Sequence, residues 1–410
     1  MENNQRAILT VGGGQETLPG IRLAQSMGLH VIVSDANPNA VCMAVADDQI
    51  LASTYDISAT LAAVKHFHKT IRPIDGVICI ATDVALTVAT IAEELGLPGI
   101  PLESARIASD KYLMRDCFKA NGLPIPWYSE IFTAAELKHV VRTHGFPLIV
   151  KPVDSRGSRG VLRLTPDIDL KWAYSTACSY SPAGRVIVEE YLTGPQVSTE
   201  SLVIERGVYT IGFSDRNYEY LERYAPYIVE NGGELPSILP AREQLLICSV
   251  VAKTANALGI TNGVIKGDMV ITDGKPYIIE VAARLSGGYF CSHEIPTNTG
   301  VDFLGAAIRL ALGESLDESK LSPQYSNPVC QRYFFSEPGR VTSIEIPAWI
   351  DLNPNVIMCE LRVHPGDILP VDAPHSLRVG VVITTGKTSA EAKKLAERVI
   401  YEVLIETDQV

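Results

Sequence analysis

The sequence lacks the features that would assign it to several common classes. None of its eight cysteines forms a CxxC pair, and several stand inside apolar runs such as GVICIAT, so neither a disulfide framework nor a cysteine metal site is expected. No window of about 18 apolar residues is present, which argues against a membrane-spanning helix. No basic run with interleaved aromatic residues is present, and the formal net charge is −12, so nucleic acid is not an expected partner.

What is present indicates a globular protein of ordinary composition. Hydrophobic residues make up 46% of the 410 residues and charged residues 20%, which fits a chain of about two to four domains. The N-terminal segment MENNQRAILTV has neither the basic start nor the long apolar run of a signal peptide. We therefore expect a cytoplasmic protein with reduced thiols, no membrane association and small-molecule substrates.

The N-terminal part of the chain alternates strand and helix patterns. Strands are expected in AILTVGG, HVIVSDANP and IDGVICIATD, and helices in LPGIRLAQSMG and ALTVATIAEELG. This βαβ series predicts a parallel sheet with helices on both faces. Gly12, Gly13 and Gly14, with Asp35 after the next strand, also fit a dinucleotide site, but Thr17 stands where GxGxxG requires its third glycine. A dinucleotide-dependent oxidoreductase is therefore the least favoured alternative.

The rest of the chain divides into three further segments. A capped helix carrying Lys111 leads into an αβ segment that ends near residue 190. The next segment contains GVIKGDMVITDGKPYIIEVAARLSGG, which fits two antiparallel strands joined at residues 272–274. Beyond residue 326, strands and the helix SAEAKKLAERVIYEVL form a separate α+β tail. We predict an α/β plus α+β fold with domains at 1–105, 106–190, 191–325 and 326–410.

The predicted hairpin carries a pair of acids. Asp268 and Glu280 stand on its two strands, so folding at the turn brings the two carboxylates into one neighbourhood. Carboxylate oxygens together with substrate phosphates are the ligands that suit Mg²⁺. The alternative is that both acids are solvated strand residues. Glu280 follows the apolar run YII, which argues for a partner that meets its charge, a metal ion or a guanidinium.

A second pattern surrounds Lys151. The stretch FPLIVKPVDSRGSRGVLRL fits a strand, a lysine, a loop of small and basic residues and another strand. Glycines let backbone N–H groups approach an anion, and Lys151 adds an ammonium. The alternative is a simple hairpin connector. Farther along, the strand-edge segment at Glu189, Glu190 and Leu192 could pair its backbone with an adenine edge. Gln196 or Glu200 could then reach a ribose or the pocket next to the metal.

Taken together, in this order and at these separations, these patterns resemble the ATP-grasp superfamily, in particular its carboxylate–amine ligases, which include amino-acid ligases and biotin carboxylase. The resemblance covers nearly the whole chain. It implies an ATP-grasp fold with a Rossmann-like N-terminal domain at 1–105, a small lid subdomain with a glycine-rich loop at 106–190, a central domain at 191–325 and a C-terminal α+β domain at 326–410.

The resemblance also implies roles for individual residues. Lys111 in SDKY and Lys151 in LIVKP would contact the phosphates of ATP, and Lys151 and Arg284 would be catalytic, with Arg284 facing the reacting acyl phosphate. Asp268 and Glu280 match the paired metal ligands of the family. The implied ATP-binding residues are Lys111, Lys151, Ser155, Arg156, Gly157, Ser158, Glu189, Glu190, Leu192 and Gln196.

Three positions depart from the family pattern. Gln196 stands where related ligases have an acid that contacts the ribose. The first metal acid is usually a glutamate, whereas Asp268 is one methylene shorter. The family also has an asparagine two residues after the second metal acid, where this chain has Ala282. The resemblance therefore implies ATP with one or two Mg²⁺ ions, and Mn²⁺ is an alternative metal.

The implied reaction is activation of a small carboxylic acid or amino acid by the γ-phosphate of ATP. The resulting acyl phosphate is attacked by an amine, and ADP and phosphate are released. A bicarbonate-dependent carboxylase and a catalytically silent ATP-binding protein are the alternatives, and a homodimer is the expected assembly. Each proposed substrate contact also fits a loop residue, and His293 fits a structural histidine better; the candidates are Arg216, Glu230, Arg284, Gly287, Gly288 and His293.

Overall fold

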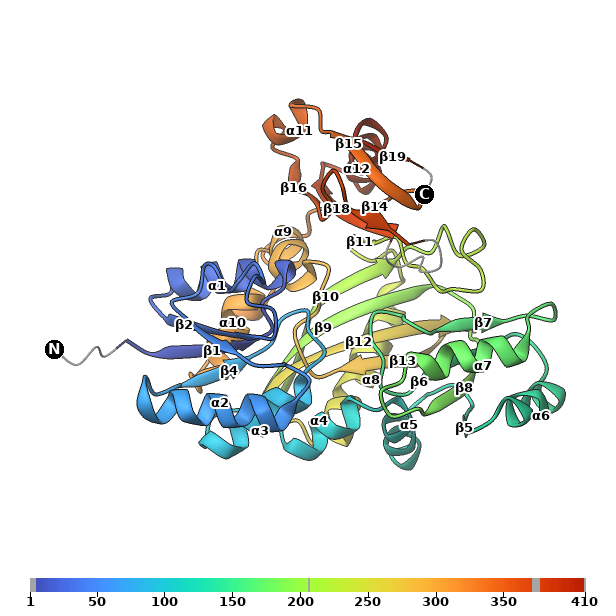
Figure 1. The fold of residues 1–410 in the computed structure, drawn as a ribbon, viewed down its shortest axis with the longest axis horizontal. Coiled ribbons are helices and arrows are strands. Elements are labelled where there is room, and N and C mark those ends of the chain that lie inside the picture. Colours follow the sequence, from blue (N-terminus) through green and yellow to red (C-terminus); the bar gives the residue numbers. More distant parts are fainter. Residues whose placement is uncertain (1–4, 206, 371–376, 409–410) are drawn as a thin grey trace.

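The computed structural model describes residues 5–205, 207–370 and 377–408. The first four residues, which belong to the segment that argues against a signal peptide, lie outside the described residues. Among the described residues, no helix has both the length and the apolar character needed to cross a membrane. Figure 1 shows an elongated lower body of helices and sheets with the C-terminal part of the chain standing on top of it.

The N-terminal unit is the parallel sheet that the sequence predicts. Its strands run in the order β3-β2-β1-β4 and pair in parallel. All five residues of β1 are buried, because helices cover the sheet. The elements are β1 (Ala7–Val11), η1 (Gln15–Thr17), α1 (Leu18–Ser26), β2 (His30–Asp35), β3 (Asp48–Leu51), α2 (Ile57–Thr70), β4 (Gly76–Ile78) and α3 (Ala85–Leu95).

Two short helices, rather than one, lead out of this unit. The helix α4 (Leu102–Ala108) ends at Ser109, and the side chain of Asp110 then accepts hydrogen bonds from the N–H groups of Tyr112 and Leu113, which caps a new helix, α5 (Lys111–Ala120). Lys111 is therefore the first residue of α5. Its position is fixed by the cap.

A small antiparallel sheet follows, at the right of Figure 1. Its strand order is β5-β8-β6-β7, and the apolar faces of two helices close its core. The elements are β5 (Tyr128–Ile131), α6 (Ala134–His144), β6 (Leu148–Pro152), β7 (Leu162–Leu164), α7 (Leu170–Ser179) and β8 (Val186–Glu190). Lys151 lies on β6, and the loop DSRGSRG joins β6 to β7.

An eight-stranded sheet forms the centre of the molecule. Its order is β13-β12-β9-β10-β11-β14-β18-β16, with every described pair antiparallel. The elements up to residue 321 are β9 (Gln196–Ile204), β10 (Gly207–Arg216), β11 (Gly233–Leu235), α8 (Ala241–Ala257), β12 (Gly263–Thr272), β13 (Lys275–Ala282), η2 (Phe290–Glu294), α9 (Ile295–Thr299), α10 (Phe303–Ala311) and η3 (Glu318–Leu321).

The C-terminal part shares this sheet rather than forming a separate one. β14 pairs with β11 and carries the sheet across residue 326, and a second sheet, β17-β15-β19, lies beyond it. The domain boundary at 326 stays a prediction, but hydrogen bonds connect its two sides. The elements are β14 (Val329–Phe335), β15 (Gly339–Glu345), α11 (Trp349–Leu352), β16 (Val356–Leu361), β17 (Ile368–Leu369), β18 (Arg378–Thr385), α12 (Ser389–Glu402) and β19 (Leu404–Asp408).

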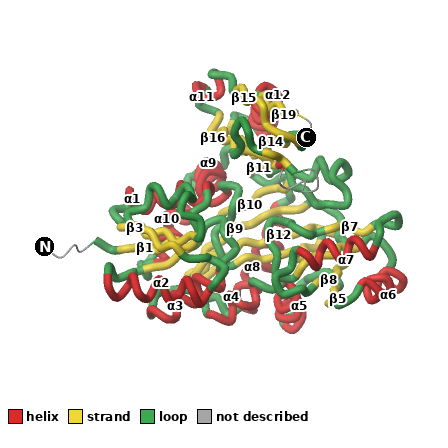
Figure 2. Tube along the Cα trace, in the orientation of Figure 1, coloured by secondary structure: helices red, strands yellow, loops and turns green. Residues whose placement is uncertain are grey.

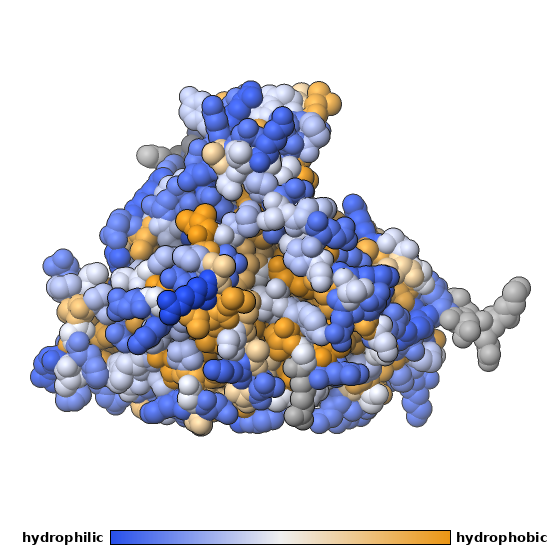
Figure 3. Space-filling model, turned by 180° about the vertical axis from the view of Figure 1, so that it is seen from behind, coloured by the Kyte–Doolittle hydropathy of each residue, from blue (hydrophilic) through white to orange (hydrophobic). Residues whose placement is uncertain are grey.

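The sheets differ in how helices are placed around them. In Figure 2 helices border the N-terminal and small sheets, while the central strands run between these two units. On the opposite side of the molecule, shown in Figure 3, hydrophobic residues gather toward the middle of the face and hydrophilic residues dominate its edges. Residues of the N-terminal unit, of the small sheet's unit and of the central sheet line a common cavity, and the candidate site lies there.

Candidate active site

The predicted acid pair stands side by side on the central sheet. β12 and β13 are joined by the two residues Asp273 and Gly274, and the register places Asp268 directly opposite Glu280. Directly opposed strand residues point to the same face of the sheet. The hairpin that the sequence predicts is therefore confirmed, together with the proximity of its two carboxylates.

The strand before Glu280 contains one residue more than its partner strand, and this explains the two consecutive isoleucines. Asp268 pairs with Glu280 but the next residue, Met269, pairs with Ile278, so Ile279 is a β-bulge with no partner across the strand. Ile278 is fully buried, whereas Ile279 lines a cavity. The Ile279 carbonyl accepts a hydrogen bond from Nη2 of Arg115 at 2.6 Å. The bulge thus turns Glu280 toward the cavity.

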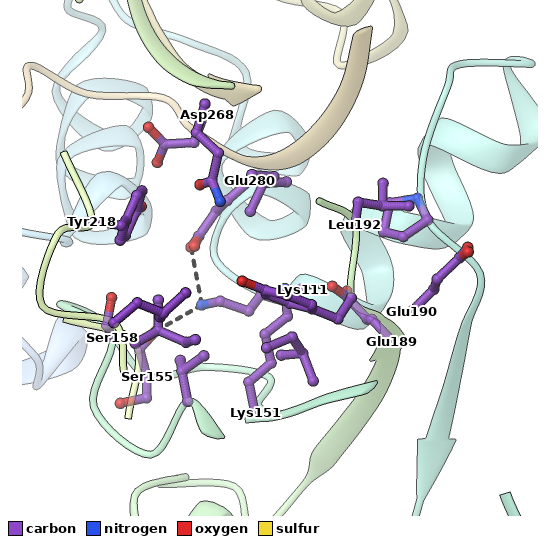
Figure 4. Close-up of a pocket in the computed structure, with 18 of the residues that line it drawn as sticks. Lys111, Lys151, Ser155, Ser158, Glu189, Glu190, Leu192, Tyr218, Asp268 and Glu280 are labelled. Carbon is purple, nitrogen blue, oxygen red and sulfur yellow. Dashed lines mark hydrogen bonds and ion pairs between the residues drawn. The ribbon is translucent and has the colours of Figure 1, made fainter. Parts of the chain in front are cut away.

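Lys111 meets the second acid. Its Nζ lies 3.0 Å from Oε1 of Glu280 and donates to the carbonyl of Ser155 at 2.7 Å, and both contacts are drawn in Figure 4. The Glu280 side chain is 40% exposed. The expected partner of Glu280 was a metal ion or a guanidinium; the structure supplies an ammonium, and the carboxylate faces a cavity rather than the core.

Lys151 belongs to a buried ion network. Its Nζ lies 2.7 Å from Oε2 of Glu189, and Arg115 donates to both Glu189 oxygens, at 2.8 and 3.1 Å. Burial opposes the ionisation of Glu189, but the charges of Arg115 and Lys151 outweigh it and lower the pKa of Glu189 to about 2. Both carboxylate oxygens are thus engaged, and Glu189 fixes the position of the Lys151 ammonium.

The glycine-rich loop reaches across to the N-terminal unit. The Arg156 guanidinium stacks on the ring of Tyr55 at 3.9 Å and donates to the carbonyl of Asp83 at 3.4 Å. Gly157 and Ser158 both have positive φ angles, 61° and 55°. This backbone conformation bends the loop over the space beside Lys111.

Two adjoining cavities lie between these elements. The first has a volume of about 280 Å³ and the second about 300 Å³, which is near the lower end of the usual range for ligand sites. All ten predicted ATP-binding residues line the first cavity, and so do Asp268 and Glu280; Figure 4 shows this arrangement. The residues that line both cavities, and so form their border, are Lys111, Ser155, Arg156 and Glu280.

Arg284 lines the second cavity. Its Nε donates to Oδ1 of Asp83 at 2.6 Å. The two residues lie on different units, because Asp83 follows β4 of the N-terminal sheet and Arg284 follows β13. A backbone bridge between Ile80 and Leu285 joins the same two segments. Arg284 is therefore held by the N-terminal unit, at the far side of the cavity border from Lys151.

The other predicted substrate contacts do not line either cavity. Arg216 is ion-paired with Glu230, which also accepts from the N–H of Gly232. His293 lies 2.9 Å from Oγ of Ser292 and edge-on to the ring of Tyr289, and burial lowers its pKa. These contacts give each side chain a partner within the fold, and their roles in substrate binding stay predictions.

The paired glycines accommodate a carboxylate of the N-terminal unit. Gly288 donates its N–H to Oε2 of Glu16 at 2.7 Å, and a Cβ on Gly287 would lie 2.6 Å from the same oxygen. Glu16 is also ion-paired with Arg362 at 2.7 Å. Glu16 thus lies against both glycines, and their proposed contact with the substrate stays a prediction.

Several functional candidates escape sequence reasoning. Asp83, Arg115 and Glu16 act through partners far away in the chain, and nothing in their local sequence marks them. Lys266 is different, because it lies on β12 two residues from Asp268 and so shares its face of the sheet, directly opposite Glu200 of β9. That spacing is a signal which the sequence contains.

Asp35, the acid that a dinucleotide site would use, is hydrogen-bonded within the N-terminal unit. Oδ2 of Asp35 accepts from the N–H of Gly13 at 2.8 Å, and Oδ1 accepts from the N–H of Asn37 at 2.8 Å. Asp35 therefore stabilises the turn after β1 and the turn after its own strand.

The donor set fits a hard divalent cation with few protein ligands. Asp268 and Glu280 supply carboxylate oxygens on one side of the first cavity, and no cluster of three or more His, Cys, Asp or Glu residues suited to a metal occurs in the parts of the chain that the structure describes. Mg²⁺ bound by one or two carboxylates completes its shell with water and substrate phosphates. The residues present thus fit Mg²⁺ bound together with a nucleotide.

Models of known families match most of the chain. The family model described as an ATP-grasp domain matches residues 108–288, an ATP-grasp N-terminal domain matches residues 21–99, and an L-amino acid ligase C-terminal domain 2 matches residues 332–408. The protein y4rH of Sinorhizobium fredii, described as uncharacterized, is 26% identical over 391 residues, which are 93% of this chain and 79% of that protein.

Two further relatives carry named activities. A D-alanine–D-alanine ligase of Aromatoleum aromaticum is 31% identical over 200 residues, 48% of this chain, and the match covers 63% of that protein, less than two thirds. The crystal structure of an L-amino acid ligase from Bacillus licheniformis superposes with a TM-score of 0.84 over 99% of both chains at 22% identity. The two ATP-grasp models together match more than half of the chain, and with the fold they show that this chain belongs to the ATP-grasp superfamily.

Proposed function

We propose that the chain is an ATP-dependent ligase that joins a small carboxylic acid or amino acid to an amine. The observation that carries this proposal is the pair of adjoining cavities with Lys111 and Glu280 at their border. One cavity holds Lys151 and the glycine-rich loop, and the other holds Arg284. A phosphoryl group that moves from a nucleotide in the first to an acid in the second would pass between positioned charges, which is the main requirement of phosphoryl transfer.

The nucleotide would occupy the first cavity. Lys111 and Lys151 would contact its phosphates, with the N–H groups of residues 155–158 above them, and the backbone at Glu190 and Leu192 would pair with the adenine. Asp268 and Glu280 would hold Mg²⁺ or Mn²⁺, which when bound neutralises charge on the transferring phosphoryl group. Glu189, which also lines the first cavity, would keep the Lys151 ammonium in place beside the nucleotide.

The reaction would proceed in two steps. A carboxylate oxygen of the substrate attacks the γ-phosphorus, and the bond from that phosphorus to ADP breaks, which gives an acyl phosphate. The nitrogen of the amine then attacks the acyl carbon, the carbon–oxygen bond to phosphate breaks, and the amine gives up a proton. Arg284 would face the oxygens of the acyl phosphate and stabilise the charge that develops there.

Amino acids are the proposed substrates. Support comes from the match of residues 332–408 to the C-terminal domain of L-amino acid ligases and from the sequence similarity to D-alanine–D-alanine ligases. The interior next to the acid pair also contains the ion pair of Arg216 and Glu230, charges suited to the carboxylate and ammonium groups of an amino acid. A homodimer and a cytoplasmic location stay predictions.

A phosphate-release screen tests the proposal. Purified protein with ATP and Mg²⁺ is offered pairs of amino acids and small carboxylates, each partner is omitted in turn, and the coupled product is identified by mass spectrometry. ADP formation that needs both partners supports the ligase. ADP formation that needs bicarbonate would indicate a carboxylase instead, and tight ATP binding in calorimetry without turnover would indicate a silent binding protein. Glu280→Gln, with its fold verified by circular dichroism, should abolish the Mg²⁺-dependent turnover.

A further inference from the structure

Three neighbouring strands present two parallel rows of side chains to the first cavity and its surroundings. The register of β9, β12 and β13 aligns residues directly across the sheet, so the members of each row point to the same face. One row is polar throughout and contains the acid pair. The rows are Ser198–Asp268–Glu280 and Glu200–Lys266–Ala282.

Lys266 already neutralises the first acid. Its ammonium is ion-paired with Oδ2 of Asp268, and the hydroxyl of Ser198 donates to Oδ1 of the same carboxylate. The side chain of Lys266 is 16% exposed and that of Asp268 is 28% exposed, so the pair is partly shielded from water. Each oxygen of Asp268 thus has a partner, and each keeps a further lone pair on the side of the cavity.

The second row offers no ligand for an additional ion. Ala282, directly opposite Lys266, has no donor atom. Glu200 is fully buried, accepts hydrogen bonds from the N–H and the hydroxyl of Ser286 and, unlike Asp268, lines neither cavity. A divalent ion placed between Asp268 and this row would also lie beside the Lys266 ammonium. Neighbouring like charges repel strongly when they are shielded from solvent. The sheet therefore offers cavity-facing carboxylates for one metal ion, at Asp268 and Glu280, and a fixed positive charge, the Lys266 ammonium, beside Asp268.

We propose that Lys266 is a built-in cation of this site, a positioning residue that holds Asp268 and takes the place of a second divalent ion. The protein then binds one metal ion per nucleotide. The inference rests on the proposed nucleotide site, because the ion is bound together with phosphates. The charge arrangement is specific to lysine at this position, since a compact ammonium approaches a single carboxylate oxygen as a point charge.

The first test counts ions. The full-length protein is saturated with a non-hydrolysable ATP analogue and titrated with Mn²⁺, and bound ions and bound nucleotide are measured together by equilibrium dialysis and electron paramagnetic resonance. One Mn²⁺ per bound nucleotide is expected. Two ions per nucleotide would overturn the inference and leave the proposed ligase intact, whereas absence of any nucleotide binding would overturn both.

The second test removes the ammonium. Lys266→Met keeps the length of the side chain and frees the charge of Asp268, so the affinity for Mn²⁺ should rise roughly tenfold while kcat falls, a split that a merely structural residue would not give. Lys266→Met combined with Ala282→Asn should bind a second Mn²⁺, and Ala282→Asn alone should still bind one. Lys65→Met, which removes an exposed ammonium ion-paired with Glu94, is the matched control and should change neither quantity. Unchanged Mn²⁺ affinity in Lys266→Met, or a second ion in Ala282→Asn alone, would contradict the proposed role of Lys266.

Discussion

Arg284 is positioned by a residue of another unit, and this arrangement separates its role from that of the lysines. Asp83 fixes the guanidinium by a hydrogen bond of 2.6 Å, and the side chain of Arg284 is only 14% exposed. Lys151 meets a carboxylate on the opposite side of the cavity border, and Lys111 meets one at the border itself. The charges therefore surround the border from both sides, and their contributions to catalysis can be distinguished.

The first prediction concerns Arg284. Arg284→Ala should lower kcat by a factor of about 10² to 10³, the effect typical of a lost transition-state donor. The KM for ATP should change by less than about threefold, because the proposed nucleotide site is the other cavity. Steady-state ADP release with the substrates found in the screen measures both. Arg309→Ala, which removes an exposed arginine on α10, should leave both constants unchanged; an effect of Arg284→Ala confined to ATP affinity would remove Arg284 from the catalytic role.

A second residue with an unusual environment is Glu294, in the short π-helix η2. It is 3% exposed, and among the described residues no side chain forms a hydrogen bond or ion pair with it. Burial raises its pKa to about 8, although the charge of Arg216 opposes the shift. A protonated carboxyl is thus favoured in the folded state, whereas an unfolded chain ionises it near pH 4.5.

The second prediction follows from this raised pKa. Because the folded state binds the extra proton, the contribution of Glu294 to stability is full below about pH 4.5 and is lost as the pH rises toward 8. The Glu294→Gln side chain does not ionise, so the variant should not show this loss. Relative to wild type, it should raise the free energy of unfolding more at pH 8.5 than at pH 5, by on the order of 2 kcal/mol or more. Urea unfolding at the two pH values measures the difference. Glu397→Gln, at an exposed position of α12, is the control, and an equal pH dependence in wild type and Glu294→Gln would contradict the assignment.

The site residues that could be predicted are those that lie next to a recognisable local sequence pattern. Lys111 follows a capping aspartate, Lys151 ends a strand before a glycine-rich loop, and the acid pair flanks a two-residue turn, so each could be found from the sequence. Arg115 and Asp83 could not. Their partners, Glu189 and Arg284, stand 74 and 201 residues away, and tertiary packing alone brings them together.

Secondary-structure elements were also predictable where the pattern that marks them is local. Strands and helices with clear periodicity, such as β2 and α3, lie where the sequence predicts them. The sequence did not predict the pairing of β14 with β11, because the identity of a strand's partner in the sheet leaves no mark in that strand's own sequence. The bulge at Ile279 was missed for a related reason, since a continuous apolar run does not show which residue lacks a partner.

The turn between β12 and β13 sets the register of the acid pair. Its two residues, Asp273 and Gly274, have φ angles of 51° and 69°, as a two-residue hairpin turn with positive φ at both positions requires. An added Cβ on Gly274 would meet no atom within 4 Å. The glycine is therefore needed for its backbone conformation and not for space.

The third prediction isolates that backbone effect. Gly274→Ala should lower the free energy of unfolding by about 1 kcal/mol, because alanine is strained at positive φ. Gly14→Ala is a matched control, since Gly14 also has open space around it but a φ of −69°, and it should be neutral or slightly stabilising. Urea unfolding of the two variants compares them directly. Equal destabilisation by both would show that the turn is not under conformational constraint.

At the scale of the whole molecule, the largest hydrophobic core among the described residues crosses several units. The largest cluster of buried residues includes Val31 of the N-terminal sheet, Leu202 of the central sheet and Val381 beyond residue 326. The helix α10 contacts α1, β4 and β12 and so connects the first two. The small sheet with α6 and α7 has a separate core. This division predicts that the small sheet can open independently of the rest, as a movable lid over the first cavity would.

Two large-to-small substitutions test this division. Phe303→Ala in α10 removes a fully buried side chain from the shared core and should cost about 3 to 5 kcal/mol. Hydrogen exchange followed by mass spectrometry should then show lost protection in β1, β12 and β18 together, with peptides of β6 and β8 unchanged. Leu137→Ala, at a fully buried position of α6, should give the reverse pattern. If either substitution lowered protection equally in both regions, the small sheet would be part of a single cooperative unit, and closure of the site could not be a motion of that sheet alone.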